Sequence, residues 1–157
     1  MIRVLCVCTG NTCRSPMLAA LLAAALQRRG IAALVESAGV AAWPGEPASE
    51  GAQRALARRG LDLSGHRSQP LAGLDLARYA RIYAVSPRHA AFLRAQGVEP
   101  ARLAVVAAEH GGVPDPYGGD DEAYEEIAAL LAAEAEAIAE ELRSLQPPPA
   151  DAPPAGG

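Results

Sequence analysis

The sequence contains no lysine: all 14 basic residues among its 157 are arginines, set against 18 acidic residues. The net charge of −4 gives no indication of a nucleic-acid partner. No apolar run approaches the ~18 residues that span a bilayer. The first apolar run is short, and no small-residue cleavage site of a signal peptide follows it. We therefore expect a cytoplasmic protein that does not associate with membranes.

Cysteine is scarce as well. The three cysteines, Cys6, Cys8 and Cys13, are an odd number at close spacing, which argues against a secreted disulfide framework. No Cys/His cluster has the spacing of metal ligands, so we expect no metal site. No Gly-x4-Gly-Lys-Ser/Thr motif occurs, which excludes the usual nucleotide-binding loop, and we expect no cofactor. A cytosolic protein with a reactive thiol fits these absences best.

Segments of strand and helix periodicity alternate along the chain, with Ala and Leu in place of aromatic residues. Strands are expected at residues 2–7, 32–40, 81–86 and 102–107. Helices are expected up to residue 29 and at residues 48–59, 87–96 and 120–145, with a short one at 72–79. This alternation predicts an α/β fold, a doubly wound four-stranded parallel sheet with helices on both faces. Residues 1–145 would form a single domain and residues 146–157, rich in Pro, Ala and Gly, a disordered tail.

Charge is distributed unevenly along the chain. Residues 1–102 hold 13 arginines against six acidic residues, whereas residues 103–157 hold one arginine against twelve. The arginine-rich part would help to attract anionic substrates. The acidic part, most of it a predicted helix, would present a solvated face.

Residues 8–16, Cys-Thr-Gly-Asn-Thr-Cys-Arg-Ser-Pro, lie between the end of the first predicted strand and the start of the following helix. Gly10 and Asn11 are the residue types that best tolerate positive φ, so the backbone can curl here. A backbone curled at a helix N-terminus turns several N–H groups toward one point and binds anions. Cys8 would enter this nest from the strand, and Arg14 would close it from the helix.

This arrangement predicts a nucleophilic thiolate. A helix N-terminus and a guanidinium lower the pKa of a nearby thiol, so we expect Cys8 to be largely ionised at neutral pH. Main-chain donors and the fork of Arg14 suit a tetrahedral dianion. Together they indicate attack on a phosphoryl group through a cysteinyl-phosphate intermediate. The Cys-x5-Arg spacing alone is a weak signal, and the flanking strand and helix with the Gly-Asn between them make it specific.

Residues 8–16 resemble the signature of the low-molecular-weight protein tyrosine phosphatase family, Cys-x-Gly-Asn-x-Cys-Arg-Ser-Pro, without departure. The resemblance covers residues 1–145. Thr12, where a bulky aliphatic residue is usual, resembles the bacterial branch that removes phosphate from arginine. The resemblance implies a cofactor-free hydrolase that acts on phosphorylated protein side chains and releases inorganic phosphate. It also implies that the loop binds the substrate through Thr9, Gly10, Asn11, Thr12, Cys13 and Ser15.

A general acid is needed to protonate the leaving group. The best candidate is Asp115, which stands in the loop Asp-Pro-Tyr-Gly-Gly before the last helix. An ordinary turn explains the same residues, because Asp-Pro beside Gly-Gly is good turn chemistry anywhere. The resemblance implies the catalytic reading, since an Asp-Pro-aromatic triplet carries the acid in that family. Asp115 would then protonate the leaving atom and later activate the hydrolytic water.

Four residues correspond to family positions that form a hydrogen-bonded network behind the loop: Asn11, Ser15, Ser37 and His66. Asn11 in a left-handed conformation is strained, and side-chain hydrogen bonds would hold it there. Taken singly, Ser15 suits a helix cap, Ser37 a buried strand hydroxyl and His66 a surface loop.

The resemblance also bears on Cys13, which either packs under the loop or traps oxidised Cys8 as a reversible disulfide. Trp43 and Tyr117, both in loops, are expected as walls of the substrate cleft, where a flat ring accepts a phenyl group or a guanidinium plane. Cys6 is expected to pack inside its strand.

His89 and His110 have no support from any motif and are expected at the surface.

Phosphoarginine is favoured over phosphotyrosine because the Thr12 hydroxyl suits a phosphoguanidinium better than an aromatic ring.

Three alternatives remain open. The first is a general tyrosine phosphatase, and the second is a phosphate-binding module without catalysis. The third is a thiol-linked arsenate reductase, which needs relay cysteines that do not follow Cys13. We expect a monomer whose partners are phosphorylated proteins.

Overall fold

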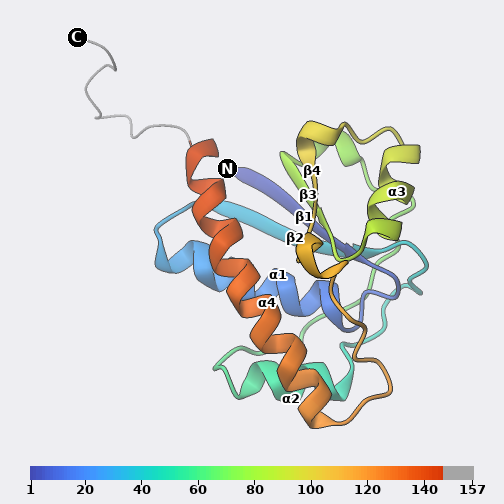
Figure 1. The fold of residues 1–157 in the computed structure, drawn as a ribbon, viewed down its shortest axis with the longest axis vertical. Coiled ribbons are helices and arrows are strands. Elements are labelled where there is room, and N and C mark those ends of the chain that lie inside the picture. Colours follow the sequence, from blue (N-terminus) through green and yellow to red (C-terminus); the bar gives the residue numbers. More distant parts are fainter. Residues whose placement is uncertain (147–157) are drawn as a thin grey trace.

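The computed structural model describes residues 1–146, so residues 147–157, nearly all of the predicted disordered tail, lie outside the described residues. Within residues 1–146 four strands form one parallel sheet in the order β2-β1-β3-β4 (Figure 1). The strands are β1 (Ile2–Cys8), β2 (Ala33–Gly39), β3 (Arg81–Ala84) and β4 (Leu103–Val105). The predicted doubly wound parallel sheet is confirmed.

Helices cover both faces of this sheet (Figure 1). The described α-helices are α1 (Arg14–Arg28), α2 (Glu50–Ala57), α3 (Pro87–Ala95) and α4 (Asp121–Leu142). Helices α1, α2 and α4 pack on one face and α3 on the other. Among the described helices, none combines the length and the apolar character needed to cross a membrane.

Several predicted helices are shorter than expected, among them α2, which covers Glu50–Ala57 and not residues 48–59. The one at residues 72–79 is reduced to a single 3-10 turn, Leu76–Arg78, because the Asp75 side chain caps the turn by accepting from the Ala77 amide. Gly73 just before it adopts a φ of 92°, outside the helical range. Helix α4 ends at Leu142 and passes into a 3-10 turn.

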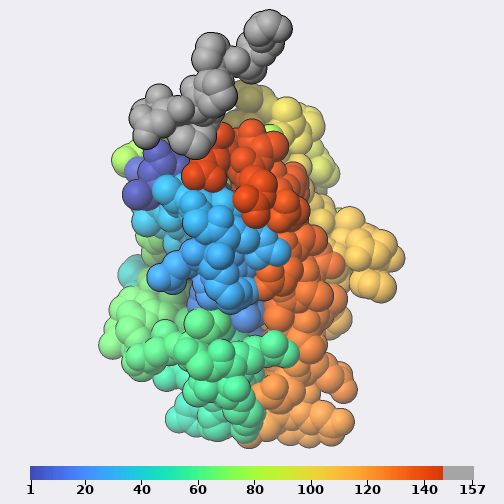
Figure 2. All heavy atoms as spheres, turned by 90° about the vertical axis from the view of Figure 1, so that its left-hand side faces the viewer, coloured from blue at the N-terminus to red at the C-terminus, as the bar shows by residue number. Residues whose placement is uncertain are grey.

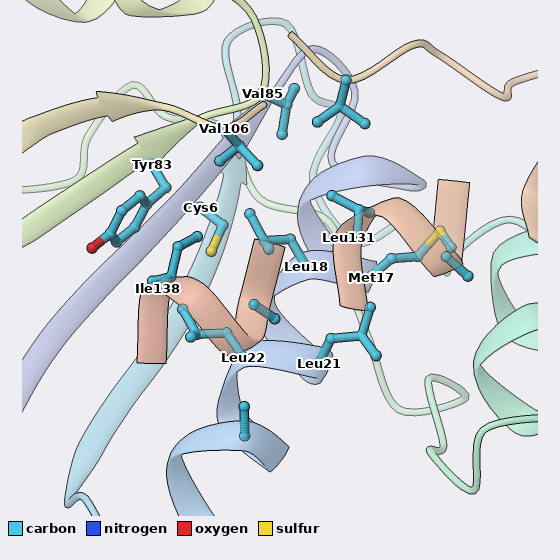
Figure 3. Close-up of a cluster of buried hydrophobic side chains, with 14 of the residues drawn as sticks. Cys6, Met17, Leu18, Leu21, Leu22, Tyr83, Val85, Val106, Leu131 and Ile138 are labelled. Carbon is cyan, nitrogen blue, oxygen red and sulfur yellow. The ribbon is translucent and has the colours of Figure 1, made fainter. Parts of the chain in front are cut away.

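Alternate residues of β1 point to opposite faces of the sheet and build two cores. Leu5 joins the core under α3, whereas Cys6 joins the core formed with α1 and α4. In the close-up, Cys6 and Tyr83 of the sheet face Leu18 of α1 and Ile138 of α4 (Figure 3). Cys6 is fully buried, which confirms its predicted packing position. Removing this apolar surface from water stabilises the sheet between its two helix layers.

The acidic helix α4 is tied to the arginines of α1 and α2. Figure 2 shows α4 (orange to red) running along this side of the molecule beside α1 (blue) and the segment that contains α2 (green). The expected solvated face therefore describes only some of the acidic side chains of α4, because four of its carboxylates form ion pairs with arginines of other helices. The ion pairs join Arg28 to Glu136, Arg29 to Glu136 and Glu140, Arg54 to Asp121, and Arg58 to Asp121 and Glu125.

The order of the strands places the loop after β1 at a special position. From β1 the chain passes to β2 on one side, and from β3 it passes to β4 on the other, so the direction of winding reverses between β1 and β3. Ligands of doubly wound sheets bind at this kind of switch point, outside the carboxyl ends of the strands. Cys8 is the last residue of β1 and pairs with Gly39, the last residue of β2.

Gly39 brings β2 unusually close to the loop that follows β1. A Cβ atom at Gly39 would overlap the carbonyl oxygen of Thr9 and lie 3.0 Å from the amide nitrogen of Asn11. Backbone atoms cannot rotate away as a flexible side chain can. The position therefore requires glycine for space, and not for a positive φ.

We expect Gly39→Ala to destabilise the fold by about 1–3 kcal/mol, the usual cost of overpacking a filled site. The measurement is urea unfolding followed by circular dichroism. Gly65→Ala is the matched control, because a Cβ there meets no atom within 4 Å, and its cost should stay within about 0.5 kcal/mol. Equal stabilities of the two variants would contradict the close approach of β2 to the loop.

Candidate active site

The loop between β1 and α1 is curled as the sequence predicts. Asn11 is fully buried and adopts a left-handed conformation with a φ of 58°. Helix α1 begins after Cys13, and no side chain caps its first amides. These amides therefore remain available to an anion at the positive end of the helix dipole.

The sulfur of Cys8 lies at the centre of this curl. The residue is only 3% exposed. The amide of Asn11 donates a hydrogen bond to Sγ at 3.3 Å, and the Ser15 hydroxyl lies 2.9 Å from it. Both contacts favour the ionised form of the sulfur.

Burial nevertheless raises the pKa of the Cys8 thiol above its ordinary value, because the charged form loses its water. The hydrogen bonds of Ser15 and Asn11 lower this pKa, and the charge of Arg14 lowers it further, but burial is the larger effect. The prediction of a lowered pKa, made from a helix N-terminus and a guanidinium alone, is therefore wrong for this arrangement.

Arg14 is nearly buried, and its guanidinium is engaged away from the sulfur. Nη1 donates to the carbonyl oxygen of Val113 at 3.0 Å, and Nη2 lies 3.6 Å from Oδ2 of Asp115. The guanidinium thus fastens the loop of residues 113–119 to the start of α1.

The network behind the loop contains the four predicted residues. The side-chain amide of Asn11 donates to Ser15 Oγ at 2.8 Å and to Ser37 Oγ at 2.9 Å. The ring of His66 donates from Nε2 to the carbonyl oxygen of Asn11 at 2.7 Å. The sequence did not indicate the role of Gln69, whose main-chain amide donates to Asn11 Oδ1 at 2.9 Å. A main-chain contact of this kind leaves no signal in the residue type.

A cavity of about 230 Å³ opens above the sulfur. Asp115 reaches it from the loop before α4, far from Cys8 in the sequence, and Tyr117 stands beside it with its side chain 75% exposed. The Tyr117 amide donates to Asp115 Oδ1 at 3.0 Å, which orients the carboxylate. The residues that line the cavity are Cys8, Thr9, Gly10, Thr12, Cys13, Asp115 and Tyr117.

Cys13 and Trp43 are both expected at the substrate site, but only Cys13 lines the cavity. Cys13 lines the same cavity as Cys8, and its Sγ contacts Ser49 Oγ at 3.3 Å and Tyr124 Oη at 3.4 Å. All three cysteines are free thiols. Trp43, by contrast, is not among the residues that line the cavity, and its side chain is 78% exposed. The carbonyl oxygen of Trp43 accepts a hydrogen bond from the Ser68 hydroxyl, which ties its loop to residue 68.

His89 is not a surface residue, and that prediction is wrong. Its side chain is 2% exposed, and its ring nitrogens lie 2.6 Å from Ser86 Oγ and 2.7 Å from Thr9 Oγ1. The sequence held one usable signal: Ser86-Pro87 marks the start of a helix directly after β3, which puts His89 in the first turn at the carboxyl end of the sheet. His110 is exposed, as predicted.

A second, more open groove of about 410 Å³ lies on the other side of the network, between α1, β2 and the loop of residues 62–69. It touches Ser37 and His66 but neither Cys8 nor Asp115, so it lacks the reactive groups. In the described part of the chain, no group of three or more His, Cys, Asp or Glu side chains is placed to hold a metal ion.

Known proteins are similar to this chain in sequence and in fold. Residues 3–146 match the family model of low molecular weight phosphotyrosine protein phosphatase. A protein-arginine-phosphatase of Geobacillus stearothermophilus is 35% identical over 92% of this chain and 98% of its own. Low molecular weight protein-tyrosine phosphatase A of Mycobacterium tuberculosis is 37% identical over 80% of this chain and 82% of its own.

Among solved structures, a mutant of YwlE arginine phosphatase with a phosphorylated active-site serine superposes with a TM-score of 0.84. It is 31% identical and covers 90% of this chain and 96% of its own. A match of the family model over nearly all described residues, together with relatives above 30% identity, leads to one conclusion: the chain belongs to the low molecular weight phosphotyrosine protein phosphatase family.

Proposed function

We propose that this phosphatase hydrolyses phosphorylated protein side chains through a phosphoryl group carried on Cys8, with phosphoarginine as its preferred substrate. One observation carries the proposal: Cys8 and Asp115, which lie far apart in the sequence, line the same small cavity. A nucleophile and a proton donor on two sides of one cavity are the parts that a two-step displacement needs.

In the first step the sulfur of Cys8 attacks phosphorus, and an S–P bond forms while the P–N or P–O bond to the substrate breaks. Asp115 in its acid form gives its proton to the departing nitrogen or oxygen. The uncapped amides of α1 and the guanidinium of Arg14 bind the phosphoryl oxygens. To do so, Arg14 has to exchange part of its contact with Val113 for the substrate.

In the second step a water molecule attacks phosphorus, and the carboxylate of Asp115 takes its proton. The S–P bond breaks, inorganic phosphate leaves, and the sulfur keeps the electron pair. Ser15, 2.9 Å from the sulfur, donates its hydroxyl proton in a hydrogen bond to the thiolate that is released. Asn11, Ser37 and His66 act by holding the loop in place.

The choice of substrate depends on Thr12, which lines the same cavity as Asp115. A hydroxyl and a carboxylate can both accept hydrogen bonds from a guanidinium, whereas a phenyl ring offers no such donor. Relatives of both kinds occur: one is named a protein-arginine-phosphatase and another a protein-tyrosine phosphatase. Phosphotyrosine is therefore the second candidate, supported by Tyr117 at the rim of the cavity.

We further propose that the protein acts as a monomer in the cytoplasm, where its three free thiols stay reduced. We also propose that Cys13 captures an oxidised Cys8 as a reversible disulfide, and its position in the lining of the same cavity supports this role. An arsenate reductase remains a remote alternative, since no cysteine follows Cys13 in the sequence.

Acid quenching during turnover of a phosphoarginine-containing protein should leave a phosphoryl group on the peptide that contains Cys8. Mass spectrometry of the quenched protein identifies the labelled residue. The Cys8→Ser variant should retain the group far longer, because an alkoxide is a poorer leaving group than a thiolate. Turnover with no phosphoryl group found on the phosphatase itself would show that water attacks the substrate directly and would overturn the covalent route.

The thiol of Cys8 should titrate at a higher pH when Ser15 is replaced by Ala. Burial raises the pKa of this thiol and the Ser15 hydrogen bond lowers it, so the loss of that hydrogen bond moves the pKa further up. Alkylation by iodoacetamide follows the thiolate fraction. Its rate at pH 7 should fall, and the midpoint of the rate against pH should rise.

Ser64→Ala, in an exposed loop, is the control for the alkylation experiment and should leave the midpoint where it is. An unchanged or lower midpoint for Ser15→Ala would mean that the hydroxyl does not stabilise the thiolate.

Thr12→Ile should lower the preference for phosphoarginine over phosphotyrosine peptides by about tenfold, the effect of one lost polar contact. The measurement is the ratio of the two kcat/KM values for peptides of the same sequence. Thr12→Ser keeps the hydroxyl and should keep the ratio. If the ratio is the same for Ile and Ser, Thr12 does not determine the choice of substrate.

A further inference from the structure

A buried histidine that takes no part in the chemistry above touches the nucleophile loop. His89, in the first turn of α3, lies between the cap of its own helix and the residue that follows Cys8. Its Nδ1 is 2.6 Å from Ser86 Oγ, and its Nε2 is 2.7 Å from Thr9 Oγ1. Thr9 in turn lines the cavity. A continuous line of hydrogen bonds therefore runs from the end of β3 into the site.

The ring is neutral at physiological pH. Burial lowers the pKa of His89 to about 4, and the positive charges of Arg14 and Arg88 add to this effect, while Asp115 opposes it. These three groups come from α1, from α3 itself and from the loop before α4. A neutral imidazole has one N–H donor and one acceptor nitrogen, so the hydrogen bonds on its two sides have opposite directions.

The helix cap favours one of the two directions. Ser86 Oγ already accepts a hydrogen bond from the His89 amide at 3.3 Å. Its own proton then needs an acceptor, and Nδ1 is the acceptor at hydrogen-bond distance. In this direction Nδ1 is unprotonated and Nε2 carries the ring proton, which is the tautomer that the helix cap favours. Nε2–H consequently donates to Thr9 Oγ1.

Thr9 is held on its main-chain side as well. Its carbonyl oxygen accepts from the Ala41 amide at 3.0 Å, just after the close approach of Gly39. With its oxygen occupied by the ring N–H, the hydroxyl keeps its own proton for another acceptor. Thr9 lines the cavity, so a phosphoryl group bound there would bring acceptor oxygens beside this residue.

We propose that His89 is a positioning residue, which orients the Thr9 hydroxyl so that its proton is donated to a phosphoryl oxygen in the cavity. This inference rests on the proposed function for its role in turnover, but its geometry applies to any phosphate that enters the site. Thr9 is then a binding residue through its side chain and not only through its backbone. His89 acts only through Thr9.

The test is a double-mutant cycle of His89→Leu and Thr9→Val, read out in two ways. The first readout is the dissociation constant of inorganic phosphate, and the second is kcat/KM with 4-nitrophenyl phosphate. Each single substitution should weaken both quantities by about fivefold to tenfold, the size of one hydrogen bond. In the Thr9→Val background, His89→Leu should have less than a twofold further effect, because the hydroxyl that it orients is gone.

Three controls separate positioning from a merely structural role. His89→Gln offers a side-chain N–H in place of Nε2–H and should restore phosphate binding to within about threefold of the original. His110→Leu changes an exposed histidine and should leave both readouts unchanged. Histidine ring ¹⁵N spectra of the unmodified protein should show Nδ1 of His89 unprotonated at pH 7.

The outcomes distinguish the two proposals. Additive effects in the phosphate-binding cycle, a failed rescue by His89→Gln in a folded protein, or a protonated Nδ1 would each overturn the role of His89. A non-additive binding cycle in a protein that turns over no phosphate ester would instead support His89 and refute the proposed function.

Discussion

The left-handed backbone of Asn11 is the constraint on which the site depends. A non-glycine residue at a φ of 58° costs on the order of 1–3 kcal/mol, and only this conformation turns the Asn11 amide toward the Cys8 sulfur. Its side chain offsets the cost by donating to two hydroxyls and accepting from the Gln69 amide. The partners come from α1, from β2 and from the loop after α2. The Cys8 sulfur and its loop are therefore held by the tertiary fold, and not by the loop alone.

Charge is divided between two tasks in this fold. Arginines of α1 and α2 pair with α4, so part of the positive charge of the first hundred residues is neutralised at a helix interface. Exposed pairs of this kind contribute little energy each, but they favour one packing of α4 over others. Arg14 is different: it is nearly buried, and its partners belong to the loop that carries Asp115. One cation thus joins the loop that follows Cys8 to the loop that carries Asp115.

The local part of this site could be predicted from the sequence, because a strand, a curled loop and a helix occupy consecutive residues. The alternation of elements predicted the sheet, and the motif placed Cys8, Asn11 and Arg14 correctly at one end of it. Gln69 and Gly39 could not be predicted, since their roles depend on which segments of main chain, far apart in the sequence, lie side by side. The surface position predicted for His89 was wrong for the same reason: its burial follows from β3 lying beside β1.

The raised pKa of Cys8 has the same origin as the binding power of the site. Burial removes water from the sulfur and would do the same to an incoming phosphoryl dianion, so both charges depend on fixed donors. In the arrangement described here the strongest donor, Arg14, is turned toward Val113 and Asp115. A phosphoryl group that draws the guanidinium into the cavity would bring positive charge toward the sulfur at the moment when a thiolate is needed. The charge on Cys8 and the charge of a bound phosphoryl group would then depend on one another, because a buried charge is stable only where another group is placed to meet it.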